Sequence, residues 1–218
     1  MKLNHFIDDL AHTREDYGDV VLLETQMHAD PLMQFAEWFA AYSALNPQTA
    51  NAMVLSTVDS QNHPDSRVVL LKELDKNQFI FYTQYNGAKG LQMEMNPFVA
   101  LNFYWSQQAR QVRVRGVVHR ISAIESDKYF VSRPRESQLS AMTSSQSMEL
   151  SGRSELEQAY LQLDSAYAGK PIPRPECWGG YAVVPDQIEF WQGRNNRLHD
   201  RIQYSRQGDT WRRCRLAP

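Results

Sequence analysis

Short runs of β-forming residues recur at close intervals along the middle of the chain, and their spacing limits the fold more than any other feature. Strands are predicted over residues 52–58, 66–72, 78–83, 98–105 and 110–121. In the last run, Val112 and Val114 alternate with Arg113 and Arg115, which is the pattern of a strand with one buried face. Gly116 in the same run is a candidate β-bulge. The turn cluster at 59–64 predicts that the first two strands form a hairpin.

Helices are predicted between these strands rather than in alternation with them. Asp30-Pro31 is a helix start, with Asp as N-cap and Pro at the first helical position. Ser122 and Glu125 form a capping box, and further helices are predicted over 86–95 and 154–168. Four short strands are expected at the C-terminal end, over 180–184, 187–192, 199–205 and 210–215. This order predicts a mainly β fold, an antiparallel barrel with peripheral helices, in a single domain of residues 1–218.

Several classes of protein do not fit this sequence. No glycine-rich phosphate-loop or dinucleotide motif follows a strand, so a βαβ nucleotide fold is disfavoured. No apolar run approaches the ~18 residues that a membrane span needs, and no secretory signal is visible. The six histidines form no His-x-His or His-Glu-x-x-His pair, and Cys177 and Cys214 have no metal-type spacing. We therefore expect a cytoplasmic protein without a metal site.

The basic residues are biased in type and in position. They comprise 17 Arg and 6 Lys, and Arg suits bidentate recognition of phosphate and carboxylate groups. Residues 194–218 hold seven Arg against two Asp, whereas residues 1–50 hold two basic residues against eight acidic ones. The C-terminal arginines predict either an anionic ligand or a solvated basic face.

The strongest local signal lies at residues 189–201. A strand that carries Phe190 and Trp191 runs into a Gly-Arg-Asn-Asn turn, and a following strand is expected to place Arg197, His199 and Arg201 on one face. Cations beside a large planar ring suit an anionic aromatic ligand, with nucleic acid or a plain charged surface as the alternatives. Because no Gly-x-Ser-x-Gly elbow or activated cysteine is present, an enzyme with this sequence would take its reactive group from a cofactor.

Three other segments leave two interpretations open. Arg67 and Lys72 lie five residues apart, so an uninterrupted strand puts them on opposite faces, and a solvated strand tip is the simpler interpretation. Arg133-Pro134-Arg135 with Ser137 is either a phosphate-binding group or only the end of a helix. The acidic arm around Tyr17 has no strong pattern and by itself indicates a flexible terminus.

Taken together, these motifs resemble the pyridoxine/pyridoxamine 5′-phosphate oxidase family. The resemblance covers residue 14 to the end and rests on several blocks in the same order: Arg67-Val-Val-Leu-Leu-Lys72, Phe81-Tyr82-Thr83, Tyr129-Phe-Val-Ser-Arg133-Pro-Arg-Glu-Ser137-Gln, Ser145-Gln146-Ser147, Glu189-Phe-Trp191, Arg197-Leu-His-Asp-Arg201 and Arg215-Leu-Ala-Pro218. It implies an FMN-binding split barrel, a Greek-key-like antiparallel barrel that acts as a homodimer with FMN at the subunit interface. No nucleic acid or membrane partner is implied.

The resemblance also implies roles for individual residues. The positions that would contact FMN are Arg67, Val68, Val69, Leu70, Leu71, Lys72, Tyr82, Thr83, Lys89, Gln111, Gln146, Ser147, Trp191 and Arg201. The positions that would contact the substrate are Arg14, Tyr17, Lys72, Tyr129, Arg133, Ser137, Arg197 and His199, of which Arg197 and His199 would be catalytic. An N-terminal arm, residues 1–29, would cover the site, and the C-terminal strands, residues 176–218, would complete it.

The implied reaction transfers a hydride from C4′ of pyridoxine or pyridoxamine 5′-phosphate to flavin N5. Molecular oxygen then reoxidises the flavin and gives hydrogen peroxide, and pyridoxal 5′-phosphate leaves, with ammonia when the substrate is the amine. The alternatives are a split-barrel flavin oxidase for another substrate, of the phenazine-pathway type, and a non-enzymatic flavin- or nucleic-acid-binding module.

The sequence departs from the family pattern at two places. Family members often have Arg before the lysine of the FMN-phosphate segment, but here the pair is Ala88-Lys89. Residues 18–24 are acidic and apolar where relatives commonly carry basic residues, which argues against an accessory anion site in that stretch.

Overall fold

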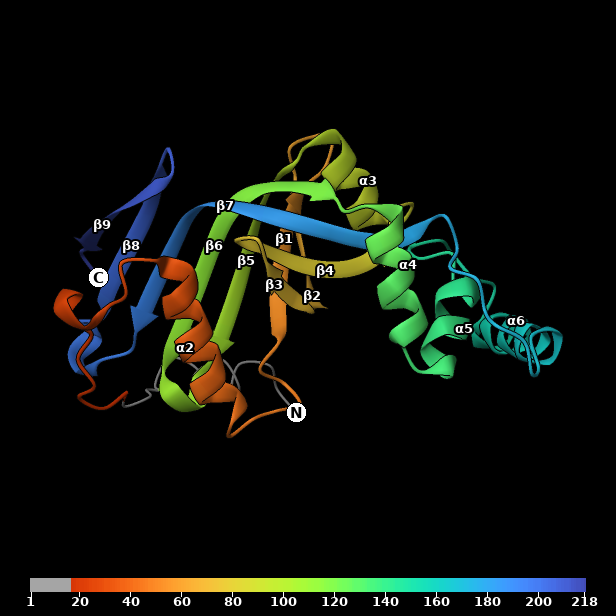
Figure 1. Ribbon diagram of the computed structural model, residues 1–218, viewed down its shortest axis with the longest axis horizontal. Coiled ribbons are helices and arrows are strands. Elements are labelled where there is room, and N and C mark those ends of the chain that lie inside the picture. Colours follow the sequence, from red (N-terminus) through yellow and green to blue (C-terminus); the bar gives the residue numbers. More distant parts are fainter. Residues whose placement is uncertain (1–16) are drawn as a thin grey trace, which may run out of the picture.

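The computed structural model describes residues 17–218 and arranges their strands in one nine-stranded antiparallel sheet with helices around it (Figure 1). The strands are β1 (Ala52–Val58), β2 (Pro64–Leu70), β3 (Glu73–Asp75), β4 (Gln78–Gln84), β5 (Phe98–Trp105), β6 (Arg110–Arg120), β7 (Trp178–Gln192), β8 (Asp200–Gln207) and β9 (Thr210–Leu216). The helices are α2 (Pro31–Ser43), α3 (Ala88–Met95), α4 (Ala123–Ser132), α5 (Arg135–Thr143) and α6 (Arg153–Ala166), with short 3₁₀ turns η1 (Glu24–Gln26), η2 (Ser106–Gln108) and η3 (Asn195–Arg197).

The strand order confirms the mainly β architecture with peripheral helices. Hydrogen-bonded neighbours run β2-β1-β5-β6-β7-β4-β3, and β8 joins this path on β7 with β9 beyond it. Helices α4, α5 and α6 lie beyond one end of the barrel, whereas the β8–β9 hairpin extends from the other (Figure 1).

Strand β7 divides the sheet. One edge pairs with β6 through residues 181–192, but the other edge pairs first with β4, through residues 178–183, and then with β8, through residues 187–192. The sequence predicted two strands here, over 180–184 and 187–192, and that prediction was wrong. Pro185 has no N–H to donate, but it lies opposite the register shift at Arg115/Gly116, where the ladder is already interrupted. The bulge expected at Gly116 is therefore confirmed, and it lets one strand serve both parts of the barrel.

Other element boundaries differ from the predicted ones where pairing with distant segments determines the structure. Strand β2 lies two residues earlier than predicted, so Lys72 is outside it, and the short strand β3 was not predicted. Helix α5 occupies most of the hydroxyl-rich stretch that follows Pro134. Strand β8 begins at Asp200, so Arg197 and His199 precede it. The sequence predicted that these two residues share one strand face with Arg201, and that prediction was wrong.

The predicted helix starts are confirmed at the level of their hydrogen bonds. The Asp30 carboxylate accepts the Leu32 N–H at 2.9 Å, and Pro31 is the first residue of α2. Ser122 and Glu125 form the reciprocal capping box of α4. These are local interactions, which is why sequence pattern finds them.

Helix α2 packs its apolar face on the barrel. Phe35 contacts Phe79 and Phe103 with ring centroids 5.0 and 4.9 Å apart, and Trp38 contacts Phe190 at 5.2 Å. Trp38 is buried, and Phe39 packs at the core's margin. A second cluster forms under α4 and α5, from Phe130, Leu139, Ala141, Ile172 and Trp178. Among residues 17–218, no helix is both long enough and apolar enough to cross a bilayer.

We predict that Gly116→Ala destabilises the fold strongly. A Cβ at this position would lie 2.1 Å from the backbone oxygen of Val184, and a backbone atom cannot move away cheaply. The free energy of unfolding should fall by about 2–4 kcal/mol, measured by urea denaturation. Gly152→Ala is the matched control, because its nearest neighbour would be the Ser154 Oγ at 3.9 Å. An equal, small effect of both changes would contradict the packing described for the bulge.

Candidate active site

Most of the predicted site residues meet in one cavity of about 420 Å³. It is walled by β2, β4, the start of α3, the α4–α5 junction and the start of β7. Its lining residues are Val68, Val69, Leu70, Lys72, Tyr82, Thr83, Lys89, Tyr129, Arg133, Pro134, Ser137, Gln146 and Trp178. Eleven of these thirteen were predicted, and they come from segments far apart in the sequence.

A bend after β2 brings Lys72 into this cavity. The Leu71 N–H donates to the Asn51 carbonyl next to β1, whereas the Lys72 N–H donates to the Ile80 carbonyl of β4. The chain thus leaves one side of the barrel and joins the other between two consecutive residues. This resolves the five-residue spacing of Arg67 and Lys72, because the strand does not continue between them. The alternative of a solvated strand tip does not describe Lys72, which lines the cavity although it is exposed.

Lys89, which lines the cavity, lies close to a second cation, Arg67. Lys89 lies in the first turn of α3, where the helix dipole disfavours a cation. Burial, and then the nearby Arg67, lower the pKa of Lys89. Its Nζ donates to Gln146 Oε1 at 2.5 Å, while Arg67 donates to Thr57 Oγ1 and pairs with Asp65. An anion bound here would relieve the repulsion between the two cations.

A hydroxyl, that of Ser147, lies against the first turn of α3 beside these two cations. The Ala88 N–H donates to Ser147 Oγ at 3.1 Å, and Ser147 has a positive φ of 71°. The residue that departs from the family pattern thus contributes its backbone, but no side-chain charge, beside Lys89.

Arg133 is a half-buried cation whose guanidinium lacks a full set of partners. Its Nη1 has no hydrogen-bond partner and no contact with solvent, and burial lowers its pKa. The guanidinium lies 4.6 Å from the centroid of the Trp178 ring, a cation–π contact. Arg133 caps the end of α4 and Pro134 precedes α5, so the junction of two helices presents it to the cavity. An unsatisfied buried donor of this kind costs stability and predicts an anionic ligand.

Aromatic rings form one wall of the cavity. Tyr82 and Tyr129 stack with centroids 3.8 Å apart and an interplanar angle of 18°, and Trp178 stacks on Tyr82 at 5.5 Å. Burial raises the pKa of Tyr82 to about 12, so its hydroxyl stays protonated. Trp178 and Pro134 are the two lining residues that the sequence did not predict, although a Trp directly before Gly179-Gly180 at a strand start was a usable signal for Trp178.

Four of the remaining predicted residues form a second group, the C-terminal cluster, defined by Tyr17, Trp191, Arg197 and His199. The Trp191 and His199 rings lie 4.7 Å apart, and Tyr17 meets both edge-on at 5.7 and 5.5 Å. Gln111 lies opposite Trp191 in the β6–β7 register. Arg197 is exposed in η3, with a φ of 60°.

His199 is held in one tautomer. The Arg194 N–H donates to its Nδ1 at 3.1 Å, so the neutral ring carries its proton on Nε2. Burial, and then the charge of Arg197, lower the His199 pKa below its ordinary value. The ring is therefore a neutral Nε2–H donor near pH 7.

Arg201 is bound to a buried carboxylate. Its Nε and Nη2 donate to the two oxygens of Glu189 at 2.8 and 3.2 Å, and its Nη1 donates to the Ala217 carbonyl. Arg113, which had no role in the sequence analysis, also pairs with Glu189, at 3.3 Å. Any contact of Arg201 with a ligand must share these bonds.

The cavity and the C-terminal cluster are separate within one chain. Trp178 and Trp191 stand near opposite ends of β7, 13 residues apart, which is up to about 43 Å along a strand at ~3.3 Å per residue. None of the residues that line the cavity belongs to the C-terminal cluster. Arg14 lies outside the described residues, so its predicted contact stays a prediction.

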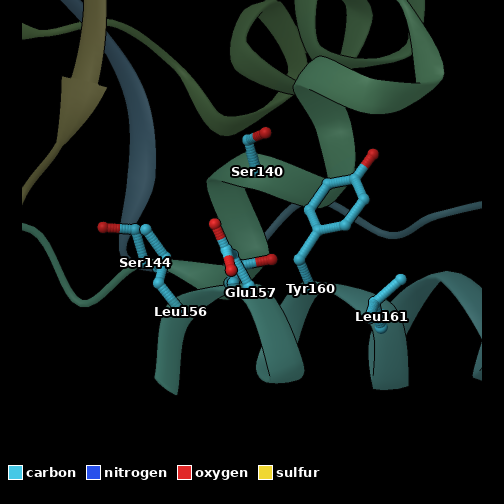
Figure 2. Close-up of a pocket in the computed structure, with 7 residues that line it drawn as sticks. Ser140, Ser144, Leu156, Glu157, Tyr160 and Leu161 are labelled. Atoms are coloured by element: carbon cyan, nitrogen blue, oxygen red, sulfur yellow. The ribbon is translucent and has the colours of Figure 1, made fainter. Parts of the chain in front are cut away.

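A different cavity, of about 480 Å³, lies between α5 and α6 (Figure 2). Leu156, Tyr160 and Leu161 line it together with Glu157 and three hydroxyl-bearing residues. It contains no lysine, arginine or predicted site residue, so it offers no charge for an anion. Among the described residues, no group of three or more His, Cys, Asp and Glu side chains could hold a metal ion.

Comparison with known proteins gives matches along nearly the whole chain. Residues 41–165 match the family model described as pyridoxamine 5′-phosphate oxidase, and residues 178–218 match the one described as pyridoxine 5′-phosphate oxidase C-terminal dimerisation region. A pyridoxine/pyridoxamine 5′-phosphate oxidase of Legionella pneumophila (strain Paris) is 56% identical over 209 residues, covering 96% of this chain and 97% of that protein. The corresponding protein of Rubrobacter xylanophilus is 49% identical, with 96% and 97% covered.

Solved structures show the same fold. The crystal structure of PhzG from Burkholderia lata in complex with tetrahydrophenazine-1-carboxylic acid superposes with a TM-score of 0.86 at 27% identity, covering 93% of this chain and all of that one. A pyridoxamine 5′-phosphate oxidase-related, FMN-binding protein from Nostoc punctiforme gives a TM-score of 0.71 at 17% identity, covering 88% of this chain and all of that one. The split-barrel architecture expected from the sequence is therefore confirmed.

We predict that His199 titrates below the ordinary histidine value of about 6.5. Because its folded pKa is lowered, the folded state binds fewer protons than the unfolded state below that pH, and this group's contribution destabilises the fold as the pH falls. A pH titration of the imidazole signals by NMR should show the low midpoint and an Nε2–H tautomer. Arg197→Gln should raise the midpoint only in part, since burial is the larger cause. A midpoint at or above the ordinary value would contradict this description.

Proposed function

The chain belongs to the pyridoxine/pyridoxamine 5′-phosphate oxidase family, and from that premise we propose that it is an FMN-dependent oxidase that makes pyridoxal 5′-phosphate. Its substrates would be pyridoxine 5′-phosphate and pyridoxamine 5′-phosphate, with O₂ as acceptor, hydrogen peroxide as a product and ammonia released from the amine. Such an enzyme serves the synthesis or salvage of vitamin B6. Both cysteines, Cys177 and Cys214, are free thiols, which is consistent with the cytoplasmic location that we also propose.

The residues present fit the phosphate of FMN. Arg67 and Lys89 are neighbouring cations, Arg67 pairs with Asp65, and Ser147 lies beside them at the start of α3. The Val68–Leu71 segment, Tyr82, Thr83 and Gln146 would contact the rest of the cofactor, with Lys72 beside them. Bound FMN would supply the two-electron acceptor of the reaction. The flavin is consistent with the family, and FMN in particular is our proposal.

One observation carries the substrate assignment: Lys72 lines the same cavity as Tyr129, Arg133 and Ser137 of the α4–α5 segment, and Arg133 has an unsatisfied buried Nη1 there. Two cations and two hydroxyls are the groups that hold a phosphate monoester dianion. The ester phosphate would give Arg133 the partner that the chain itself does not provide. This cavity therefore favours a phosphorylated substrate over an unphosphorylated one, such as a phenazine precursor.

The C-terminal cluster would act on the other side of the substrate ring. His199, as a neutral Nε2–H donor, can hydrogen-bond the substrate, and Arg197 beside it can stabilise negative charge on the ring. Tyr17, with Arg14, would cover the ring from the arm of residues 1–29. These residues orient the substrate and exclude water, which is the main task of a protein whose cofactor supplies the reactive group. Trp191, Gln111 and Arg201 are proposed to face the flavin.

We propose that the cavity of one protomer and the C-terminal cluster of its partner form each site of a homodimer. The match to a C-terminal dimerisation region supports dimer formation. The separation of Trp178 and Trp191, 13 residues apart near opposite ends of β7, supports a site shared between chains, because no residue of the C-terminal cluster lines the cavity of the same protomer. Apolar side chains exposed on β2 and β5 support an interface there: Val68 is 65%, Leu70 43% and Phe98 65% exposed. Residues 176–218 would thus complete the partner's site.

The direct test is turnover by the purified protein. With FMN and either phosphorylated vitamer under air, pyridoxal 5′-phosphate and hydrogen peroxide should form in equal amounts, and ammonia should appear only with the amine. A flavin-bound protein that makes neither product would overturn the proposal. An unphosphorylated substrate turned over in preference would favour the phenazine-type alternative.

We predict that Arg133→Met weakens substrate binding without unfolding the protein. Loss of charge-assisted hydrogen bonds to the phosphate should raise KM about 10- to 100-fold. The free energy of unfolding should change by less than about 1 kcal/mol, because the substitution also removes an unsatisfied buried donor. Arg153→Met, at a side chain that is 89% exposed on α6, is the matched control and should leave both quantities unchanged. An unchanged KM in Arg133→Met would show that the substrate phosphate does not bind in this cavity.

A further inference from the structure

The segment from Tyr17 to Met27 has almost no structure of its own. It forms only the three-residue turn η1, and Val20, Val21 and Leu23 are more than 40% exposed. Leu22 and Met27 are its buried anchors, at 7% exposure each. Apolar burial alone therefore gives this segment a weak attachment, yet it carries Tyr17 to the C-terminal cluster.

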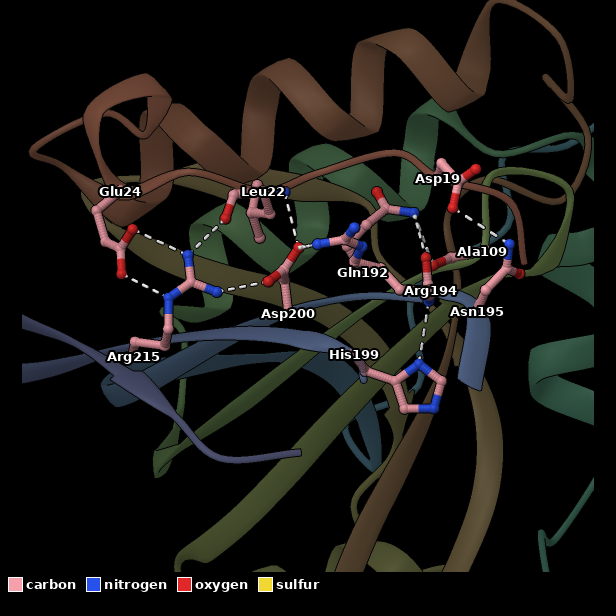
Figure 3. A network of polar contacts seen from close by, with 11 residues as sticks. Asp19, Leu22, Glu24, Ala109, Gln192, Arg194, Asn195, His199, Asp200 and Arg215 are labelled. Atoms are coloured by element: carbon pink, nitrogen blue, oxygen red, sulfur yellow. Dashed lines mark hydrogen bonds and ion pairs between the residues drawn. The ribbon is translucent and has the colours of Figure 1, made fainter. Parts of the chain in front are cut away.

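Arg215 on β9 makes three hydrogen bonds to this segment (Figure 3), and Arg213 on the same strand donates to the Met27 carbonyl at 3.0 Å. The Nε and Nη2 of Arg215 donate to the two carboxylate oxygens of Glu24 at 2.6 and 2.9 Å, and Nη2 also donates to the Leu22 carbonyl at 2.7 Å. Its Nη1 donates to Asp200 Oδ1 at 2.5 Å. One guanidinium on β9 thus connects Asp200 of β8 to Glu24, which lies 191 positions before Arg215 in the sequence.

Asp200 uses its second oxygen to hold both the segment and the turn that precedes β8. Asp200 Oδ2 accepts the Leu22 N–H at 3.0 Å and lies 3.6 Å from Arg194 Nη1. Asp200 is only 7% exposed, so this carboxylate is paired in a poorly solvated place, where its bonds are stronger than at the surface.

The same contacts continue to His199. The backbone N–H of Arg194 holds His199 Nδ1, and Asn195 Nδ2 donates to Asp19 Oδ1 at 3.2 Å (Figure 3). Residues 194–199 and residues 17–24 therefore share one network, which we name the arm clamp and define as Glu24, Arg215, Asp200 and Arg194.

We propose that Arg215 and Asp200 are positioning residues of the oxidase reaction: through the arm clamp they hold Tyr17 and His199 in one fixed arrangement against Trp191. Neither residue was assigned a contact with substrate or cofactor. They act at a distance, by limiting the arm and the 194–199 turn to the geometry that closes over the substrate ring. This inference rests on the proposed function, because it assigns Tyr17 and His199 to the substrate.

A structural role alone would have a different signature. The β8–β9 hairpin is held by backbone pairing from Arg201–Leu216 to Gln207–Thr210, which does not need the Arg215 guanidinium. Glu24 lies outside the sheet, so Glu24→Gln cannot remove a strand pairing. Loss of the clamp should therefore free the arm while the barrel and its FMN site stay intact.

The experiment uses the FMN-bound full-length protein and the variants Arg215→Gln, Asp200→Asn and Glu24→Gln. Amide hydrogen exchange over residues 17–27 should become about tenfold faster, whereas exchange over β6 stays unchanged. KM for pyridoxine 5′-phosphate should rise about 5- to 10-fold in Arg215→Gln, with the dissociation constant of FMN unchanged. Arg215→Lys should show smaller changes in exchange rate and KM than Arg215→Gln, because it keeps the positive charge. Arg212→Gln, on the same strand and exposed, is the matched control.

Two results would overturn the inference. Exchange over residues 17–27 that is the same in all variants would show that the clamp does not hold the arm. A parallel loss of FMN affinity and of thermal stability would show a structural role instead. Failure of the proposed function is distinguishable, because the wild-type protein would then show no turnover while the exchange measurement still tests the clamp.

Discussion

The backbone ladder of β7 is the constraint on which the rest of the molecule depends. One edge of this strand pairs with β6 through residues 181–192, and the other edge is divided between β4 and β8. Trp178 at its start lines the cavity that holds Lys72 and Arg133, and Trp191 near its end belongs to the C-terminal cluster. The Gly116 bulge lets the strand continue past Pro185, so a single local feature keeps both functional regions on one rigid element.

The arginines divide by whether the chain itself neutralises them. Arg201 is bonded to the buried Glu189, and Arg215 is bonded to Glu24 and Asp200, so both are satisfied within the protomer. Arg133 keeps an unsatisfied buried donor, and Lys89 is half-buried beside another cation. Since uncompensated buried charge is costly, it is expected where a ligand supplies the missing partner. This division, rather than the number of arginines, separates binding positions from positions that organise the fold.

Local signals in the sequence predicted the local structure well. The alternation of Val112 and Val114 with arginines, the Asp30 and Ser122 caps and the bulge at Gly116 all depend on neighbouring residues, and all are confirmed. The family resemblance identified eleven residues of the cavity. The sequence could not predict features that depend on contacts between distant segments. These are the bend that takes the chain from β1 at Leu71 to β4 at Lys72, the continuation of β7 through Pro185, and the placement of Trp178. The ion pair of Glu24 with Arg215 joins the two ends of the chain and leaves no periodic signal.

The central claim is that each site joins the cavity of one protomer to the C-terminal cluster of the other. Two differently tagged chains, one with Arg133→Met and one with His199→Ala, can be co-expressed and purified as a heterodimer. If the sites are shared, one site receives both defects and the other receives neither, so the heterodimer should regain about half of the wild-type activity at low substrate concentration, far above either homodimer. If each site lies within a single chain, both sites carry one defect, and the heterodimer will be as impaired as its parents, which would contradict the account.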